Sequence, residues 1–189
     1  MGNIIDLIGN TPLVEMSRVI KQPGVTVYGK LEGQNPGGSV KDRAAYGMIK
    51  GALDRGELRK GMRLVEATSG NTGIALAMIA RIFNIPITLV MPESATAERV
   101  KTMQAYGAEV VLTPADKTIE YSREYAEELS KQPEYLMLNQ FGNDDNWGMH
   151  HKTTGPEIWR DTAGKITHFV SSMGTTGTIM GTSRYLKEQ

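Results

Sequence analysis

Hydrophobic positions follow two alternating spacings along the chain. Short apolar runs rich in β-branched residues predict strands at 25–31, 63–67, 87–91, 109–112, 135–138 and 166–171. Apolar residues three and four apart predict helices at 42–56, 73–83, 97–106, 118–130, 153–161 and 178–187. This alternation predicts an α/β protein with a doubly wound, mostly parallel sheet that carries helices on both faces.

The amino-acid composition argues against several classes of function. Lys plus Arg and Asp plus Glu both total 21, so no net charge draws the chain to nucleic acid or to an acidic membrane. The absence of cysteine excludes disulfides, thiolate metal sites and a thiol nucleophile. His150 and His151 are adjacent and point in different directions in a helix or strand, which does not favour a metal site. Residues 1–9 do not resemble a signal peptide, and no apolar run is long enough to cross a bilayer, so we expect a cytoplasmic protein.

A turn rich in proline and glycine precedes the helix expected at 42–56. It reads Asn35-Pro36-Gly37-Gly38-Ser39-Val40-Lys41, and Ser39 is a residue type that caps helix N-termini. Lys41 then lies in the first helical turn, where the positive end of the macrodipole favours the neutral amine. A lysine that forms a Schiff base needs that neutral form. The alternative is a surface lysine without a chemical role.

Two further loops follow predicted strands and open predicted helices, at the sheet edge where ligands bind. Thr68-Ser69-Gly70-Asn71-Thr72-Gly73 offers hydroxyls and N–H groups to an anion such as a carboxylate. Residues 174–178 read Gly-Thr-Thr-Gly-Thr, and such glycines let the backbone approach a phosphate. The alternatives are a polar capping turn and a tight β–α turn. Together, an amine, a carboxylate loop and a phosphate loop are the parts that a pyridoxal-phosphate (PLP) enzyme for amino acids requires.

The chain resembles the fold type II PLP enzymes, whose fold is that of the tryptophan synthase β subunit. The resemblance rests on successive motifs at Gly9-Asn10-Thr11-Pro12-Leu13, 35–43, 66–73, Thr153-Thr154-Gly155-Pro156-Glu157 and 174–177. Within this group the chain resembles the cysteine synthases, also called O-acetylserine sulfhydrylases. Residues 39–45 and 171–178 are most similar to the B-type isozyme.

This resemblance implies a PLP-dependent β-replacement that makes L-cysteine from O-acetylserine and sulfide, or S-sulfocysteine from thiosulfate. Lys41 would be the catalytic residue, and the cofactor would be bound by Lys41, Asn71, Gly174, Thr175, Thr176, Gly177 and Thr178. The substrate would be bound by Thr68, Ser69, Asn71, Thr72 and Gln140. The partners would be a small amino-acid substrate, a sulfur donor and a second copy in a homodimer. The alternatives are a cystathionine β-synthase, a serine/threonine dehydratase, or an inactive fragment that does not retain PLP.

The resemblance also implies how the chain is divided. Residues 1–36 would belong to a larger domain, 37–145 would form a small α/β domain, and 146–189 would begin the larger PLP-binding domain. The helix expected at 178–187 would need a following strand to cover its other side, so we expect a C-terminally truncated enzyme. The stretch Asn143-Asp144-Asp145-Asn146 has Asp where the family often has Pro, and we expect a loop there, near the substrate.

Overall fold

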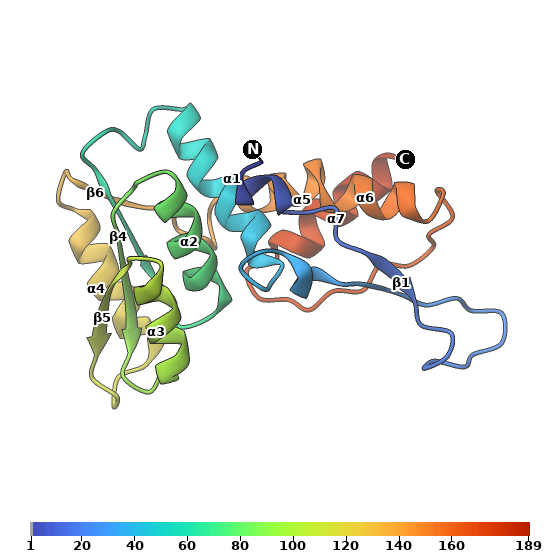
Figure 1. Cartoon of the computed structure of the whole chain (residues 1–189), viewed down its shortest axis with the longest axis horizontal. Helices are drawn as coiled ribbons and strands as arrows, with labels where there is room; N and C mark the ends of the chain where they lie inside the picture. Colours follow the sequence, from blue (N-terminus) through green and yellow to red (C-terminus); the bar gives the residue numbers. More distant parts are fainter. Residues whose placement is uncertain (1) are drawn as a thin grey trace.

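A parallel sheet lies at the centre of one part of the molecule. The computed structural model describes residues 2–189 and places this sheet beside a second group of elements (Figure 1). The four strands run in the order β5-β4-β3-β6. Their bounds are β3 (Arg63–Ala67), β4 (Ile87–Pro92), β5 (Glu109–Thr113) and β6 (Tyr135–Met137). All of β4 and most of β3 are buried, which is why both read as continuous apolar runs.

Helices cover both faces of this sheet, as the sequence predicts. Leu64 and Leu89 pack on one face with α2 (Asn71–Ile82), which lies between α1 (Lys41–Asp54) and α3 (Ala97–Ala105). Val65 and Val90 point to the other face and pack against Ala126 of α4 (Ile119–Ser130). Successive strand residues thus serve two cores, because side chains alternate across a strand.

The direction of winding reverses beside β3. The chain proceeds from β3 to β4 to β5 in one direction, and β6 then returns to pair with the free side of β3. The carboxyl ends of β3 and β6 therefore form a topological switch point, where open α/β sheets bind ligands. The loop after β3 carries Thr68 to Gly70, and the segment after β6 carries Gln140.

The second group contains elements from both the N-terminal and the C-terminal parts of the described chain. It contains the antiparallel pair β1 (Leu13–Glu15) and β2 (Tyr28–Lys30), the short helices η1 (Ile4–Leu7) and η2 (Glu32–Gln34), and the helices α5 (Asp144–Lys152), α6 (Thr154–Asp161) and α7 (Gly177–Glu188). Helix α5 packs against α1 and α7. The approach of α7 to α5 requires glycine, because a Cβ at Gly181 would overlap the carbonyl oxygen of Trp147.

The predicted elements form with two larger corrections. Residues 166–171, predicted as a strand, have no regular structure, and Val170 is 90% exposed. Among residues 2–189 no strand pairs with this segment, and a strand needs a hydrogen-bonded neighbour. The loop predicted at 143–146 is instead the start of α5. Asn143 is its N-cap and accepts a hydrogen bond from the Asp145 amide at 3.0 Å.

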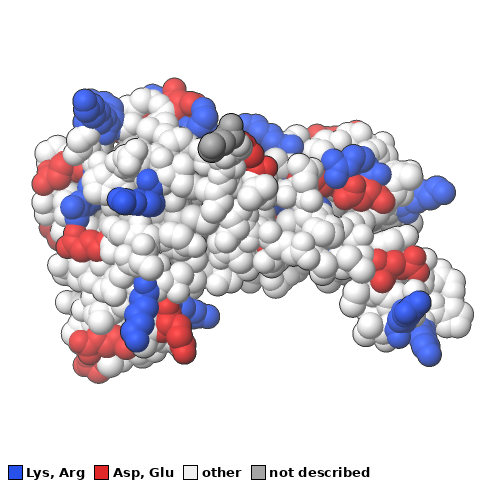
Figure 2. Space-filling model, viewed as in Figure 1, with Lys and Arg blue, Asp and Glu red and all other residues white. Residues whose placement is uncertain are grey.

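Three smaller observations complete the description of the fold. The strand predicted at 25–31 is shortened to Tyr28–Lys30. Basic and acidic side chains are interspersed over the face shown in Figure 2, in keeping with the balanced composition. No helix in the described part of the chain is long and apolar enough to cross a membrane.

Candidate active site

A cavity of about 520 Å³ lies between β2, the start of α1, α6 and the segment before α7. Lys41 lines it, together with every residue of the 174–178 loop. Its volume falls within the range of small-molecule binding sites. The structure thus brings the candidate nucleophile and the candidate phosphate loop to one place, although they are far apart in the sequence.

Lys41 is the first residue of α1 and is half-buried. Burial lowers the pKa of its amine, because desolvation disfavours the charged form. The direction is the one expected from the helix end, but the cause is burial. Ser39 does not occupy the N-cap, which is Val40. The Ser39 hydroxyl nevertheless accepts a hydrogen bond from the Lys41 amide at 3.2 Å and so supports the first turn.

The loop before α7 has the features of an anion site. Thr176 has a left-handed backbone with φ of 63°, which is strained for a β-branched residue. Its hydroxyl donates to the Thr175 carbonyl at 2.6 Å, and no side chain of residues 2–189 caps the first turn of α7. Gly177 and Thr178 line the cavity, so uncapped helical N–H groups lie at its wall. Such an N-terminus attracts phosphate.

The predicted carboxylate loop lies at the switch point of the sheet. Thr68, Thr72 and Gln140 are buried there, and the Thr72 hydroxyl donates to Gln140 Oε1 at 2.9 Å. Ser69 is half-buried and Asn71 is exposed, at the first position of α2. None of these five residues is among the described residues that line the Lys41 cavity. The structure therefore places the predicted carboxylate loop outside the Lys41 cavity, so the two parts of the predicted site do not form one pocket.

Two buried residues of α5 support this region, although the sequence assigned neither of them a role in binding. Asn146 connects the two parts, and His150 contacts residues that line the Lys41 cavity. Asn146 is buried and donates through Nδ2 to the Gln140 carbonyl at 2.8 Å and to Thr175 Oγ1 at 3.0 Å. His150 is 1% exposed and contacts the hydroxyls of Thr154 and Thr178 at 2.8 and 3.3 Å. Burial lowers the pKa of His150 to about 4, so its ring is neutral at pH 7. The signal that identifies the pair is their spacing of four on α5, which requires the helix to be predicted first.

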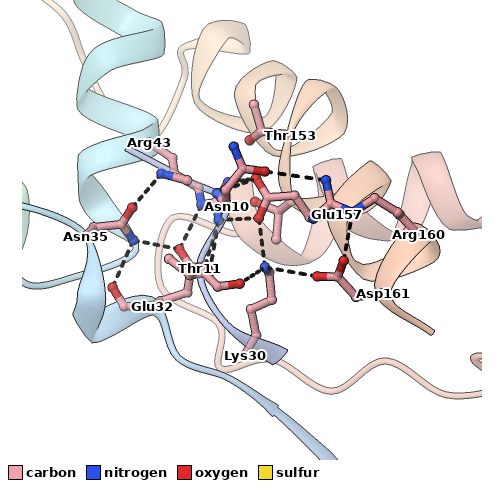
Figure 3. A network of polar contacts seen from close by, with 12 residues as sticks. Asn10, Thr11, Lys30, Glu32, Asn35, Arg43, Thr153, Glu157, Arg160 and Asp161 are labelled. Carbon is pink, nitrogen blue, oxygen red and sulfur yellow. Dashed lines mark hydrogen bonds and ion pairs between the residues drawn. The ribbon is translucent and has the colours of Figure 1, made fainter. Parts of the chain in front are cut away.

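A buried ionic network holds the elements around Lys41. The guanidinium of Arg43 is fully buried and bonds the carboxylates of Glu32 at 2.8 Å and Glu157 at 2.7 Å (Figure 3). The Lys30 amine lies 2.7 Å from Glu157 and donates to the Thr11 carbonyl at 2.6 Å. Burial alone raises the pKa of Glu157, but hydrogen bonds from Arg43 and Lys30 outweigh it and lower that pKa to about 2. The network thus joins the N-terminal segment, α1 and α6 beside the cavity.

Comparison with known proteins identifies the family. The profile of the family described as pyridoxal-phosphate dependent enzyme matches residues 4–189. The chain belongs to this family. It is similar to cysteine synthase B of Pseudomonas aeruginosa, with 55% identity over 186 residues that cover 98% of this chain and 62% of that protein. Cysteine synthase B of Escherichia coli is 53% identical over 189 residues, which cover 100% and 62% of the two chains.

The fold agrees with this membership in the PLP enzyme family. The crystal structure of a cysteine synthase from Entamoeba histolytica superimposes with a TM-score of 0.96 at 41% identity, over 100% of this chain and 57% of that one. The chain thus spans about 62% of the length of the curated relatives. Membership implies PLP as the cofactor, and the Lys41 cavity fits it, because it offers an amine for the aldehyde and N–H groups and hydroxyls for the phosphate.

Proposed function

We propose that this protein is a cysteine synthase, in which a sulfur nucleophile replaces the acetoxy group of O-acetylserine. The observation that carries the proposal is the shared cavity of Lys41 and residues 174–178. The relatives that are named cysteine synthase support the choice of substrate. Sulfide or thiosulfate is the proposed sulfur donor, since both are small nucleophiles that yield cysteine or S-sulfocysteine.

The roles proposed for the residues are those that the family resemblance implies, and the cavity of Lys41 and residues 174–178 supports the part that concerns the cofactor. PLP, when bound, supplies an aldehyde for an amine and an electron sink for a carbanion. Lys41 would hold the cofactor and, once released from it, would move the α-proton of the substrate. Burial lowers the pKa of its amine, which favours the neutral form that accepts a proton. The phosphate is held by the N–H groups and hydroxyls of Gly174, Thr175, Thr176, Gly177 and Thr178. Thr68, Ser69, Asn71, Thr72 and Gln140 would bind the substrate carboxylate, and Asn71 would also donate a hydrogen bond to the phenolic oxygen of PLP.

A division of the chain accompanies this proposal. We propose that residues 37–145 form the small domain, and that 1–36 and 146–189 belong to the larger one. The contacts of the Asn10 amide and Lys30 with Glu157 of α6 support this, and Arg43 of the small domain joins the same network at the boundary between the two. A homodimer is proposed from the family resemblance alone, whereas a cytoplasmic location remains the prediction made from the sequence pattern.

An activity assay tests the proposed function. The protein is incubated with PLP, O-acetylserine and sulfide, and the formation of cysteine is measured. Lys41→Ala is expected to abolish it, whereas Lys50→Ala on the exposed face of the same helix should leave it unchanged. Serine with homocysteine, and serine alone, are run in parallel. Formation of cystathionine or pyruvate in place of cysteine would refute the proposal.

A further inference from the structure

The side chain of Asn146 occupies the space between two loops that belong to different parts of the chain. It is 4% exposed and lies in the third position of α5, which begins at Asp144. One hydrogen bond reaches the Gln140 carbonyl in the segment after β6, and the other reaches Thr175 Oγ1 in the loop before α7. The residue therefore touches both the candidate substrate loop and the candidate phosphate loop.

The orientation of the Asn146 amide is fixed by its partners. A carbonyl oxygen only accepts hydrogen bonds, so the group that faces Gln140 O must be the Nδ2 donor. Oδ1 then faces Gly177, where a Cβ would overlap it. Asparagine and glycine thus fit each other at the start of α7. An alanine at 146 would lose both hydrogen bonds, and an aspartate would place an acceptor against the Gln140 carbonyl.

We propose that Asn146 is a positioning residue that sets the 174–178 loop relative to Gln140, and this inference rests on the proposed function. It acts through Thr175, because this is the only hydrogen bond between its amide and the loop among residues 2–189. The two hydrogen bonds of Asn146 hold the phosphate-binding loop at a fixed distance from Gln140. This distance would set how far the cofactor phosphate lies from the substrate carboxylate. Small misplacement of such groups has large effects on catalysis.

The test compares two asparagines of the same segment. Asn143 also donates through Nδ2 to a main-chain carbonyl, that of Leu138 at 2.8 Å, but it does not contact the loop before α7. Asn143→Ala is therefore a control that removes a partly buried amide and the N-cap of the same helix, but no contact with the loop before α7. The affinity for PLP is measured by absorption titration for the wild type, Asn146→Ala and Asn143→Ala. Loss of one bridging hydrogen bond is expected to raise the Kd for PLP about 3- to 10-fold in Asn146→Ala only.

A second background shows whether the effect passes through Thr175. In Thr175→Val the acceptor of the Asn146 amide is gone, so adding Asn146→Ala should change the Kd for PLP much less than in the wild type. Equal Kd values for Asn146→Ala and Asn143→Ala, or an undiminished effect in the Thr175→Val background, would overturn the positioning role while leaving the proposed function intact. A wild type that does not bind PLP would overturn both.

Discussion

Replacing one carboxylate of the buried ionic network should destabilise the fold strongly. Glu157→Gln keeps the size of the side chain but removes the charge that faces Arg43 and Lys30. The Arg43 side chain is 0% exposed and that of Glu157 is 7% exposed, so solvent screens this pair little. In the variant, Arg43 would keep the carboxylate of Glu32, and Lys30 would keep only the more distant carboxylate of Asp161, at 3.9 Å.

The expected magnitude follows from the burial. Breaking a buried ion pair by removing one partner costs about 3 to 5 kcal/mol. The free energy of unfolding of an ordinary domain is only about 5 to 15 kcal/mol. For a chain of this size the loss corresponds to a fall in Tm of roughly 6 to 20 °C. Urea unfolding followed by far-ultraviolet circular dichroism measures the free energy of unfolding directly.

An exposed pair on α1 provides the control. Lys50 and Asp54 form an ion pair whose side chains are 46% and 59% exposed. Asp54→Asn should leave the free energy of unfolding nearly unchanged, because exposed pairs contribute little. If Glu157→Gln unfolded at the same urea concentration as Asp54→Asn, the network would not hold the N-terminal segment and α6 to α1, and the reasoning would be wrong.

Two further predictions concern a buried acid and a glycine contact. Burial raises the pKa of Glu66 to about 7, above its ordinary 4.5, so its contribution to stability is present below pH 4.5 and is lost as the pH rises through 7. The free energy of unfolding of Glu66→Gln, relative to that of the wild type, should therefore be higher at pH 8 than at pH 5. If urea titrations gave the same difference between the two proteins at both pH values, the raised pKa of Glu66 would be contradicted. Gly181→Ala should destabilise by about 1 to 3 kcal/mol or more, because its Cβ would overlap the Trp147 carbonyl. Gly148→Ala, in α5 with open space around the new Cβ, should instead stabilise by up to about 1 kcal/mol. Similar Tm values for the two alanine variants would refute the close approach of α5 and α7.

The sheet and its covering helices were predictable because their apolar spacing is strong. The strand predicted at 63–67 forms with the same bounds as β3, and α2 begins only two residues before the predicted helix at 73–83. Helix α5 was not predicted, because it is mostly polar and begins with Asp-Asp-Asn, a sequence that is typical of a loop. Its stability comes from the Asn143 cap and from packing on α1 and α7. Residues 166–171 show the reverse case, an apolar run that lacks a strand partner within residues 2–189.

The candidate site was predictable where loop motifs carry it. Lys41 and the 174–178 loop stand out by residue type, and the cavity brings them together. The network of Arg43 did not stand out, because its partner Glu157 is 114 residues away in the sequence. The bridge of Asn146 likewise depends on how α5 and α7 pack, which periodicity does not report. The residues that would bind the ligands can be recognised from the loop sequences, whereas the residues that hold those loops in place are identified only by tertiary contacts.

The most direct test of the central claim is to trap the cofactor. The protein is mixed with PLP, its absorption spectrum is taken, and the complex is reduced with borohydride and mapped by peptide mass. The account predicts one label on Lys41, absent from Lys41→Ala, because this amine lines the cavity and burial lowers its pKa. No protein-bound absorption band, or label scattered over surface lysines, would contradict the claim that Lys41 and the 174–178 loop form the cofactor site.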